Sequence, residues 1–96
     1  MDIRRAIALE GRDAQGYYLE ASARLGLDDL AGAQSSVDKA IAISPHLGRA
    51  YILRAEIRKR RGLYEKVLED YRTVFGRFPY LLNEEEKGQV EVLLRG

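Results

Sequence analysis

The chain has 96 residues, with 16 Lys and Arg against 15 Asp and Glu, one His and no Cys. This length fits a single domain with a modest core, and the net charge of +1 gives no general attraction to nucleic acid or to an anionic membrane. The lack of Cys excludes disulfides and thiolate metal sites, one His is too few for a zinc set, and no apolar run approaches the roughly 18 residues of a membrane span.

The sequence repeats with a 34-residue period. The matched pairs at this interval are Tyr17 and Tyr51, Leu19 and Leu53, Ala21 and Ala55, Arg24 and Arg58, Pro45 and Pro79, and Leu47 and Leu81. Six identities exceed the roughly two that ordinary composition would give. The repeat divides one predicted domain, 1–96, into a half repeat (1–13), two full repeats (14–47 and 48–81) and a C-terminal helix (82–96).

The half repeat at 1–13 opens the chain, because residues 3–9 align with residues 37–43 at the same interval. Ile3, Ile7 and Leu9 give this segment an apolar face without a partner helix of its own. An unpaired repeat end of this kind favours pairing with another copy or with an upstream segment of a longer array.

The first full repeat is predicted to be two helices. Asp13 is a candidate N-cap for the first helix, Gly26 marks the turn, and Asp28 or Asp29 is a candidate N-cap for the second helix. The apolar residues of the second helix are spaced three and four apart, as one helix face requires, and are Leu30, Ala33, Val37, Ala40 and Ile41.

The second full repeat follows the same plan. Ser44 and Pro45 are expected to end the preceding helix and to start the first helix of this repeat, with Ser44 as its N-cap and Pro45 at the first helical position. Gly62 marks the turn to the second helix. In the last segment, Asn83 and Glu86 form a capping-box pair that predicts a C-terminal helix.

These features resemble the tetratricopeptide repeat family, whose unit is a helix–turn–helix with the same 34-residue period. Tyr17 and Tyr51 match the bulky residue early in the family's first helix, and Ala21 and Ala55 match its small residue four positions later. The resemblance implies an all-α fold of stacked antiparallel helix hairpins, a right-handed α-solenoid with two full repeats, a leading half repeat and a C-terminal capping helix. It also implies that the tyrosines and alanines pack between helices.

The resemblance further implies that the first helix of each repeat lines a concave groove that binds a peptide or protein segment. The groove residues that it implies are Gln15, Tyr18, Ser22 and Leu25 in the first repeat, and Arg49, Ile52, Glu56, Lys59 and Arg60 in the second. Tyr18 and Ile52 would then be apolar anchors, and Arg49 and Lys59 would attract carboxylates. The expected partner is a protein or peptide with acidic character.

The basic residues of the second repeat's first helix allow two interpretations. They are Arg49, Arg54, Arg58, Lys59, Arg60 and Arg61. One interpretation is a site for an acidic peptide or a phosphate. The other is a solvated helix C-terminus, where cations are favourable, with Arg54 and Arg58 lying over the core or pairing with Glu65 and Glu69.

No grouping of residues predicts catalysis. His46 follows Pro45 in a predicted turn, and Gly11 and Gly16 do not form a phosphate-binding loop. We therefore expect a non-enzymatic, cytoplasmic protein without cofactor or metal, and without nucleic-acid or membrane partners. Homo-oligomerisation through exposed repeat ends is the alternative function.

Overall fold

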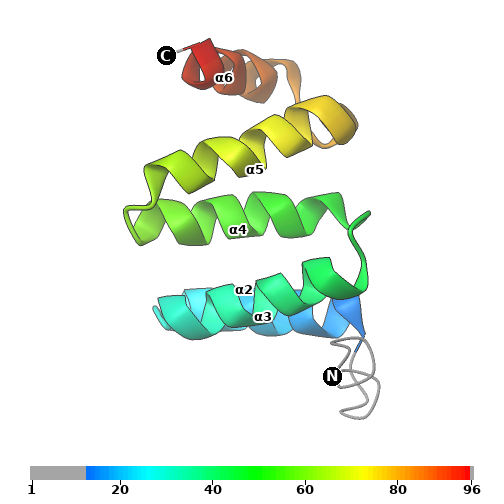
Figure 1. The fold of residues 1–96 in the computed structure, drawn as a ribbon, viewed down its shortest axis with the longest axis vertical. Helices are drawn as coiled ribbons and strands as arrows, with labels where there is room; N and C mark the ends of the chain where they lie inside the picture. Colours follow the sequence, from blue (N-terminus) through cyan, green and yellow to red (C-terminus); the bar gives the residue numbers. More distant parts are fainter. Residues whose placement is uncertain (1–12, 96) are drawn as a thin grey trace.

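The computed structural model describes residues 13–95, and this part of the chain consists of helices and turns without strands (Figure 1). The elements are α2 (Ala14–Gly26), α3 (Leu30–Ile43), α4 (Gly48–Arg60), α5 (Tyr64–Arg77), a 3-10 turn η1 (Pro79–Leu81) and α6 (Glu84–Arg95). The predicted all-helical class is confirmed. The predicted half repeat lies outside the described residues, except for Asp13.

The 34-residue interval reappears in the bounds of the helices. Helices α2 and α4 run over 14–26 and 48–60, and helices α3 and α5 run over 30–43 and 64–77. Each first bound and each last bound therefore recurs at the interval found in the sequence.

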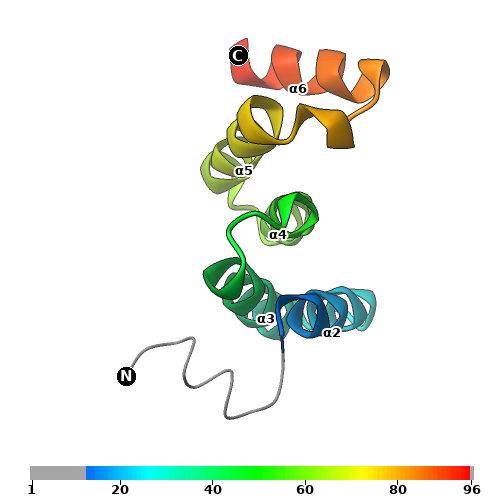
Figure 2. The same cartoon turned by 90° about the vertical axis from the view of Figure 1, so that its right-hand side faces the viewer.

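Each helix packs against the next one along the chain, and α2 also contacts α4 directly. In Figure 2, α2 and α4 lie on one side of the molecule and α3 and α5 lie on the other. The molecule is elongated, with principal extents of 42 × 26 × 22 Å. In the same view (Figure 2), α2, α4 and α6 follow one another from bottom to top, so the outer face of α4 lies between α2 and α6.

Three of the predicted caps are confirmed. The Asp13 carboxylate accepts from the Gly16 N–H at 2.7 Å, and the Asp29 carboxylate accepts from the Gly32 N–H at 3.1 Å. At the start of α6, the Asn83 side chain accepts from the Glu86 N–H, and the Glu86 carboxylate accepts from the Asn83 N–H. These bonds satisfy N–H groups that a helix start leaves without partners.

The prediction that Ser44 and Pro45 end α3 is confirmed, but the prediction that they also begin α4 is wrong. Ser44 closes α3, because its N–H donates to the Ala40 carbonyl at 2.9 Å. Pro45 lies in the turn that follows, and α4 begins only at Gly48, with Leu47 at the N-cap position and no side-chain cap. The Ser44 carbonyl accepts from the Leu47 N–H, which fixes this turn without the Ser44 hydroxyl.

The turns inside the two helix pairs share one backbone conformation. Gly62 has φ +77°, and Asp28, which occupies the equivalent place in the first repeat, has φ +62°. The prediction that Gly26 makes the first turn is therefore wrong, since α2 continues through Gly26. Asp tolerates the left-handed region better than most residues, which allows it to replace Gly here.

The two repeat tyrosines are buried in equivalent places, as the sequence predicted. Tyr17 packs with Ala40 of α3, and Tyr51 packs with Val74 of α5, the repeat equivalent of Ala40. Tyr51 also stacks on Phe78, with ring centroids 5.8 Å apart. The larger Val74 and Phe78 give the second pair a bulkier core than the first.

A second core cluster joins α2, α3 and α4. Its buried members are Ala21, Leu25, Ala33, Val37, Ala50 and Ile57. Small alanines let the three helix backbones approach, and Ile57 and Val37 fill the space that remains. This cluster fixes α4 against the first helix pair.

The start of α4 approaches η1 so closely that Gly48 has no room for a side chain. A Cβ at this position would lie 2.7 Å from both Phe78 Cγ and Leu81 Cδ1. We expect Gly48→Ala to destabilise the protein by about 1–3 kcal/mol through overpacking. Gly76→Ala, in α5 with nothing near its Cβ, should instead stabilise by about 0.5–1 kcal/mol. Urea denaturation of both variants measures the change in the free energy of unfolding. Equal changes of the same sign would contradict the close approach of Gly48 to Phe78 and Leu81.

Candidate functional site

A hollow of about 330 Å³ opens on the outer face of α4, between α2 and α5. Its lining residues are Tyr18, Arg49, Ile52, Leu53, Glu56 and Tyr71. Four of them, Tyr18, Arg49, Ile52 and Glu56, belong to the predicted groove. The hollow combines aromatic and aliphatic walls with the cation of Arg49 and the carboxylate of Glu56, which pairs with Arg60. Arg49 suits a ligand with an apolar side chain near a carboxylate.

The other predicted groove residues are distributed differently. Gln15 and Ser22 are exposed on α2 but line no part of this hollow. Leu25 is buried in the core cluster of α2, α3 and α4, because its side chain lies on the same helix face as Ala21, four positions earlier. Leu25 therefore contributes to packing and is not part of the open hollow.

A second hollow, of about 490 Å³, lies beside the first and involves α6. Its lining residues are Lys59, Tyr64, Glu65, Val67, Leu68, Tyr71, Val92 and Leu93. Tyr71 lines both hollows, so they adjoin at this side chain. Lys59 was predicted from the sequence, but the contribution of α5 and α6 was not. This contribution becomes visible only once α6 is placed against α5, and no short sequence pattern predicts that placement.

The basic helix α4 places two of its arginines in a buried ion cluster. Asp70 of α5 is 1% exposed, and its carboxylate accepts from Arg54 Nη2 at 2.8 Å and from Arg58 Nη1 at 2.9 Å. Arg54 Nη1 also donates to Asp38 of α3 at 3.2 Å. The predicted partners Glu65 and Glu69 are wrong, because neither forms an ion pair with these arginines within residues 13–95.

The environment of Arg54 keeps its guanidinium charged. Burial lowers the pKa of Arg54, but the hydrogen bonds and negative charge of Asp70, followed by those of Asp38, outweigh burial and raise it. The guanidinium lies over the Tyr51 ring, 5.5 Å from its centre, and forms a cation–π contact with it. Arg54 is thus structural and connects α3, α4 and α5.

The remaining cations of α4 separate into paired and unpaired groups. Arg60 forms an ion pair with Glu56 at 3.4 Å, and Arg61 donates to the Gln34 side chain at 2.8 Å. Among residues 13–95, no carboxylate forms an ion pair with Arg49 or Lys59. These two cations, one at the rim of each hollow, remain available to a ligand.

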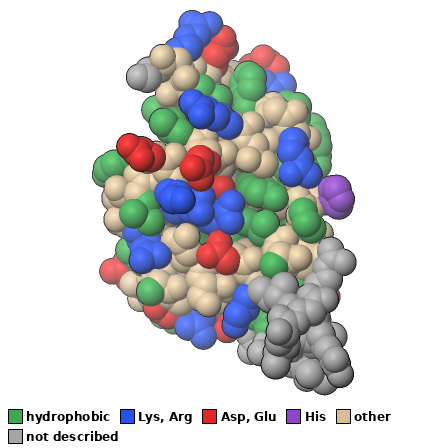
Figure 3. Space-filling view, viewed as in Figure 1, with side chains coloured by type: hydrophobic (Ala, Val, Ile, Leu, Met, Phe, Trp, Pro, Cys, Tyr) green, Lys and Arg blue, Asp and Glu red, His purple; other side chains and the backbone are tan. Residues whose placement is uncertain are grey.

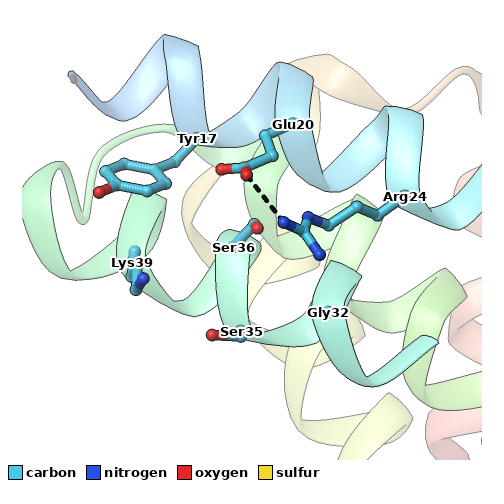
Figure 4. Close-up of a pocket in the computed structure, with 7 residues that line it drawn as sticks. All are labelled: Tyr17, Glu20, Arg24, Gly32, Ser35, Ser36 and Lys39. Atoms are coloured by element: carbon cyan, nitrogen blue, oxygen red, sulfur yellow. Dashed lines mark hydrogen bonds and ion pairs between the residues drawn. The ribbon is translucent and has the colours of Figure 1, made fainter. Parts of the chain in front are cut away.

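The first helix pair has a polar hollow of about 460 Å³ between α2 and α3, shown in Figure 4. In it Arg24 pairs with Glu20 at 3.2 Å and with Asp29 at 2.9 Å. Hydrogen bonds from Arg24 to Asp29 and Glu20 raise the pKa of Arg24. The Gly32 N–H, and then Arg24, lower the pKa of Asp29. The carboxylates of Glu20 and Asp29 thus balance the charge of Arg24.

This polar hollow is the counterpart of the buried ion cluster in the second pair. Glu20, Arg24 and Ser36 are the first-repeat equivalents of Arg54, Arg58 and Asp70. The residues at the equivalent positions Glu20 and Arg54 therefore form ion pairs in both helix pairs.

The face viewed in Figure 3 carries acidic and basic side chains side by side over its middle part. Charges of both signs mix there, so this face has no large patch of one sign. His46 is exposed in the turn between α3 and α4. Within residues 13–95, no three His, Asp or Glu side chains are grouped so as to hold a metal ion, and no helix has the length and apolar character of a membrane span.

Comparison with known proteins adds no identity. No family model matches the chain, and neither the curated proteins nor the solved structures contain a match. The fold and the site define an all-helical protein of recurring helix pairs, with two adjoining hollows, one on α4 and one between α5 and α6. The tetratricopeptide resemblance remains a prediction.

Proposed function

We propose that the chain is a tetratricopeptide-like solenoid module that binds a segment of another protein in the hollow between α2 and α4. The 34-residue recurrence of the helix bounds supports this arrangement. So does the complete burial of Ala21 and Ala55, since small residues at these places let neighbouring helices approach. The role is one of binding, without catalysis and without a cofactor.

The observation that carries the proposal is the composition of the hollow on α4. Tyr18, Ile52 and Tyr71 surround a concave space, each of them only partly buried by the protein itself. Arg49 stands at the rim without an ion-pair partner among the described residues. Partly exposed aromatic side chains around a concavity, with a free cation beside them, are typical of an anchor site for an apolar residue next to an acidic one.

The partner that this hollow favours is an acidic protein segment. A carboxylate at Arg49 is drawn in by opposite charge, and the adjacent Tyr18 and Ile52 accept an apolar side chain. Nucleic acid is a poorer fit, because Arg54 and Arg58 are already bound to Asp70 and Glu56 lines the hollow together with Arg49.

Binding of dye-labelled peptides of about ten residues tests the proposal by fluorescence anisotropy. We expect peptides with leucine and glutamate to bind, and Ile52→Glu to weaken binding at least about tenfold, which is roughly 1.4 kcal/mol. Arg49→Glu should reverse the preference toward lysine-containing peptides. Leu19→Glu on α2, exposed and outside both hollows, is the matched control for Ile52. Equal binding of acidic and basic peptides, or no effect of Ile52→Glu, would count against the proposal.

Self-association is the second candidate function. The residues first predicted for it, Ile3, Ile7 and Leu9, lie outside the described residues. Self-association would use the exposed apolar side chains of Tyr64 and Val92 in the second hollow, the same surface that a segment of a partner protein would occupy.

A further inference from the structure

We infer that the hollow between α5 and α6 is the second half of the same binding site, and that one acidic, apolar segment of a partner protein occupies both hollows. This inference rests on the proposed function and extends it. It assigns α6 a direct role in binding and states the length and charge pattern of the ligand.

The first hollow lies on one face of α4, and the same face reaches the second hollow, which α5 and α6 otherwise line, through Lys59. Arg49, Ile52, Glu56 and Lys59 are spaced three, four and three residues apart, which places them in a row along one side of the helix. The first three line the first hollow, and Lys59 lines the second. From Arg49 to Lys59 the helix rises by about 15 Å. A ligand that lies along this row passes the rim of both hollows and the side chain of Tyr71 between them.

The second hollow is apolar and unfilled by the protein's own side chains. Tyr64 and Val92 are each 67% exposed, and Leu93 is 49% exposed, although all three line a concave space. Exposed apolar side chains that are scattered singly are ordinary on a protein surface, but a group of them around one hollow indicates a contact surface. Its volume of about 490 Å³ exceeds that of the first hollow, at about 330 Å³.

The charges at the rims define the ligand further. Arg49 marks one end of the row and Lys59 marks the other, so two carboxylates about 15 Å apart match them. That span corresponds to about ten residues of a helix or to four or five residues of an extended strand. Glu56 lines the first hollow and Glu65 lines the second, and both disfavour a further carboxylate between the two ends of the row. The ligand therefore has acidic ends and apolar side chains between them.

A second copy of the chain fits this surface less well. In a two-fold contact the same patch lies on both subunits, so a hollow would face a hollow and leave unfilled space between them. Arg49 and Lys59 would also bring cations from both copies to one interface. A protruding row of side chains on another protein fills the space and supplies the opposite charge.

A peptide of about twelve residues, labelled with a dye, with glutamates near both ends and leucines between them, tests the inference. The variants are Val92→Ser/Leu93→Ser and Lys59→Glu, with Leu19→Ser as the matched exposed apolar control. We expect both groove variants to weaken binding at least about tenfold, and the control to change it less than about twofold. Thermal unfolding followed by circular dichroism verifies that each variant folds like the parent.

Each outcome decides between the hypotheses. If Ile52→Glu abolishes binding and Val92→Ser/Leu93→Ser leaves it unchanged, the inference about α6 is wrong while the proposed function stands. If neither variant changes binding, or if no acidic peptide binds below about 1 mM, both are wrong. Light scattering tests whether a second copy occupies the hollow. A dimer that persists when the peptide is added, and that the Val92→Ser/Leu93→Ser variant no longer forms, would overturn the inference.

Discussion

Replacing Asp70 by alanine is expected to lower the free energy of unfolding by about 3–5 kcal/mol. The carboxylate of Asp70 is the common acceptor of Arg54 and Arg58, whose side chains are only 18% and 11% exposed. Its removal leaves two largely buried guanidinium groups without their main counter-charge. Because small domains are stable by about 5–15 kcal/mol, this loss is a large part of the total.

Urea denaturation of Asp70→Ala provides the measurement, and Glu69→Ala is its control. Glu69 is the preceding residue of α5 but is exposed, so its replacement should change stability by less than about 0.5 kcal/mol. Replacing the whole cluster, with Arg54→Met, Arg58→Met and Asp70→Leu together, should recover most of the loss because no buried charge is left unpaired. A cost below about 1 kcal/mol for Asp70→Ala would show that water solvates the arginines.

Ile57→Ala is expected to cost about 2–5 kcal/mol. Ile57 is fully buried in the cluster that joins α4 to α2 and α3, and it is among the largest completely buried side chains of residues 13–95. Truncation removes its apolar contacts and leaves a cavity between three helices.

A graded series checks this expectation by the same denaturation measurement. Ile57→Val should cost only about 0.5–1.5 kcal/mol, because it deletes one methyl group. Val92→Ala, at an exposed site on α6, should cost less than about 0.5 kcal/mol. Equal effects of Ile57→Ala and Val92→Ala would contradict the placement of Ile57 at the junction of the two helix pairs.

Local signals in the sequence predicted most of the helical structure. The 34-residue interval located both helix pairs, and the capping residues Asp13, Asp29 and Asn83 each start the helix that they were predicted to start. Ser44 failed as a cap because the turn through Pro45 and His46 delays the next helix to Gly48. The Ser–Pro pair was predicted to end one helix and to start the next, and only the helix end lies where it was predicted, because these two residue types do not fix the length of the turn that follows.

The ion cluster was missed although the sequence contains a signal for it. Asp70 lies three residues after Val67 and four before Val74, on the buried stripe of α5. A carboxylate on such a stripe requires a buried cation, and Arg54 and Arg58 are the cations that face it. Glu65 and Glu69 lie off this stripe, which is why they do not reach the arginines.

The candidate site was predicted only where it depends on a single helix. The resemblance implied Arg49, Ile52 and Glu56 on α4 and Tyr18 on α2, and all four line the first hollow. The second hollow depends on the position of α6, which diverges from the repeat pattern and has Glu85 where the earlier helices have Tyr17 and Tyr51. The distance between α6 and α5 is set by how their side chains pack, and the sequence of either helix alone does not predict it.

The left-handed turn at Asp28 and Gly62 has a consequence for how such a chain can vary. Both turns place a residue at positive φ, +62° at Asp28 and +77° at Gly62, although the two residue types differ. Asp28 carries a conformational penalty that Gly62 avoids, on the order of 1 kcal/mol. A substitution at this position therefore changes the free energy of unfolding of one helix pair relative to the other, while the turn keeps its conformation.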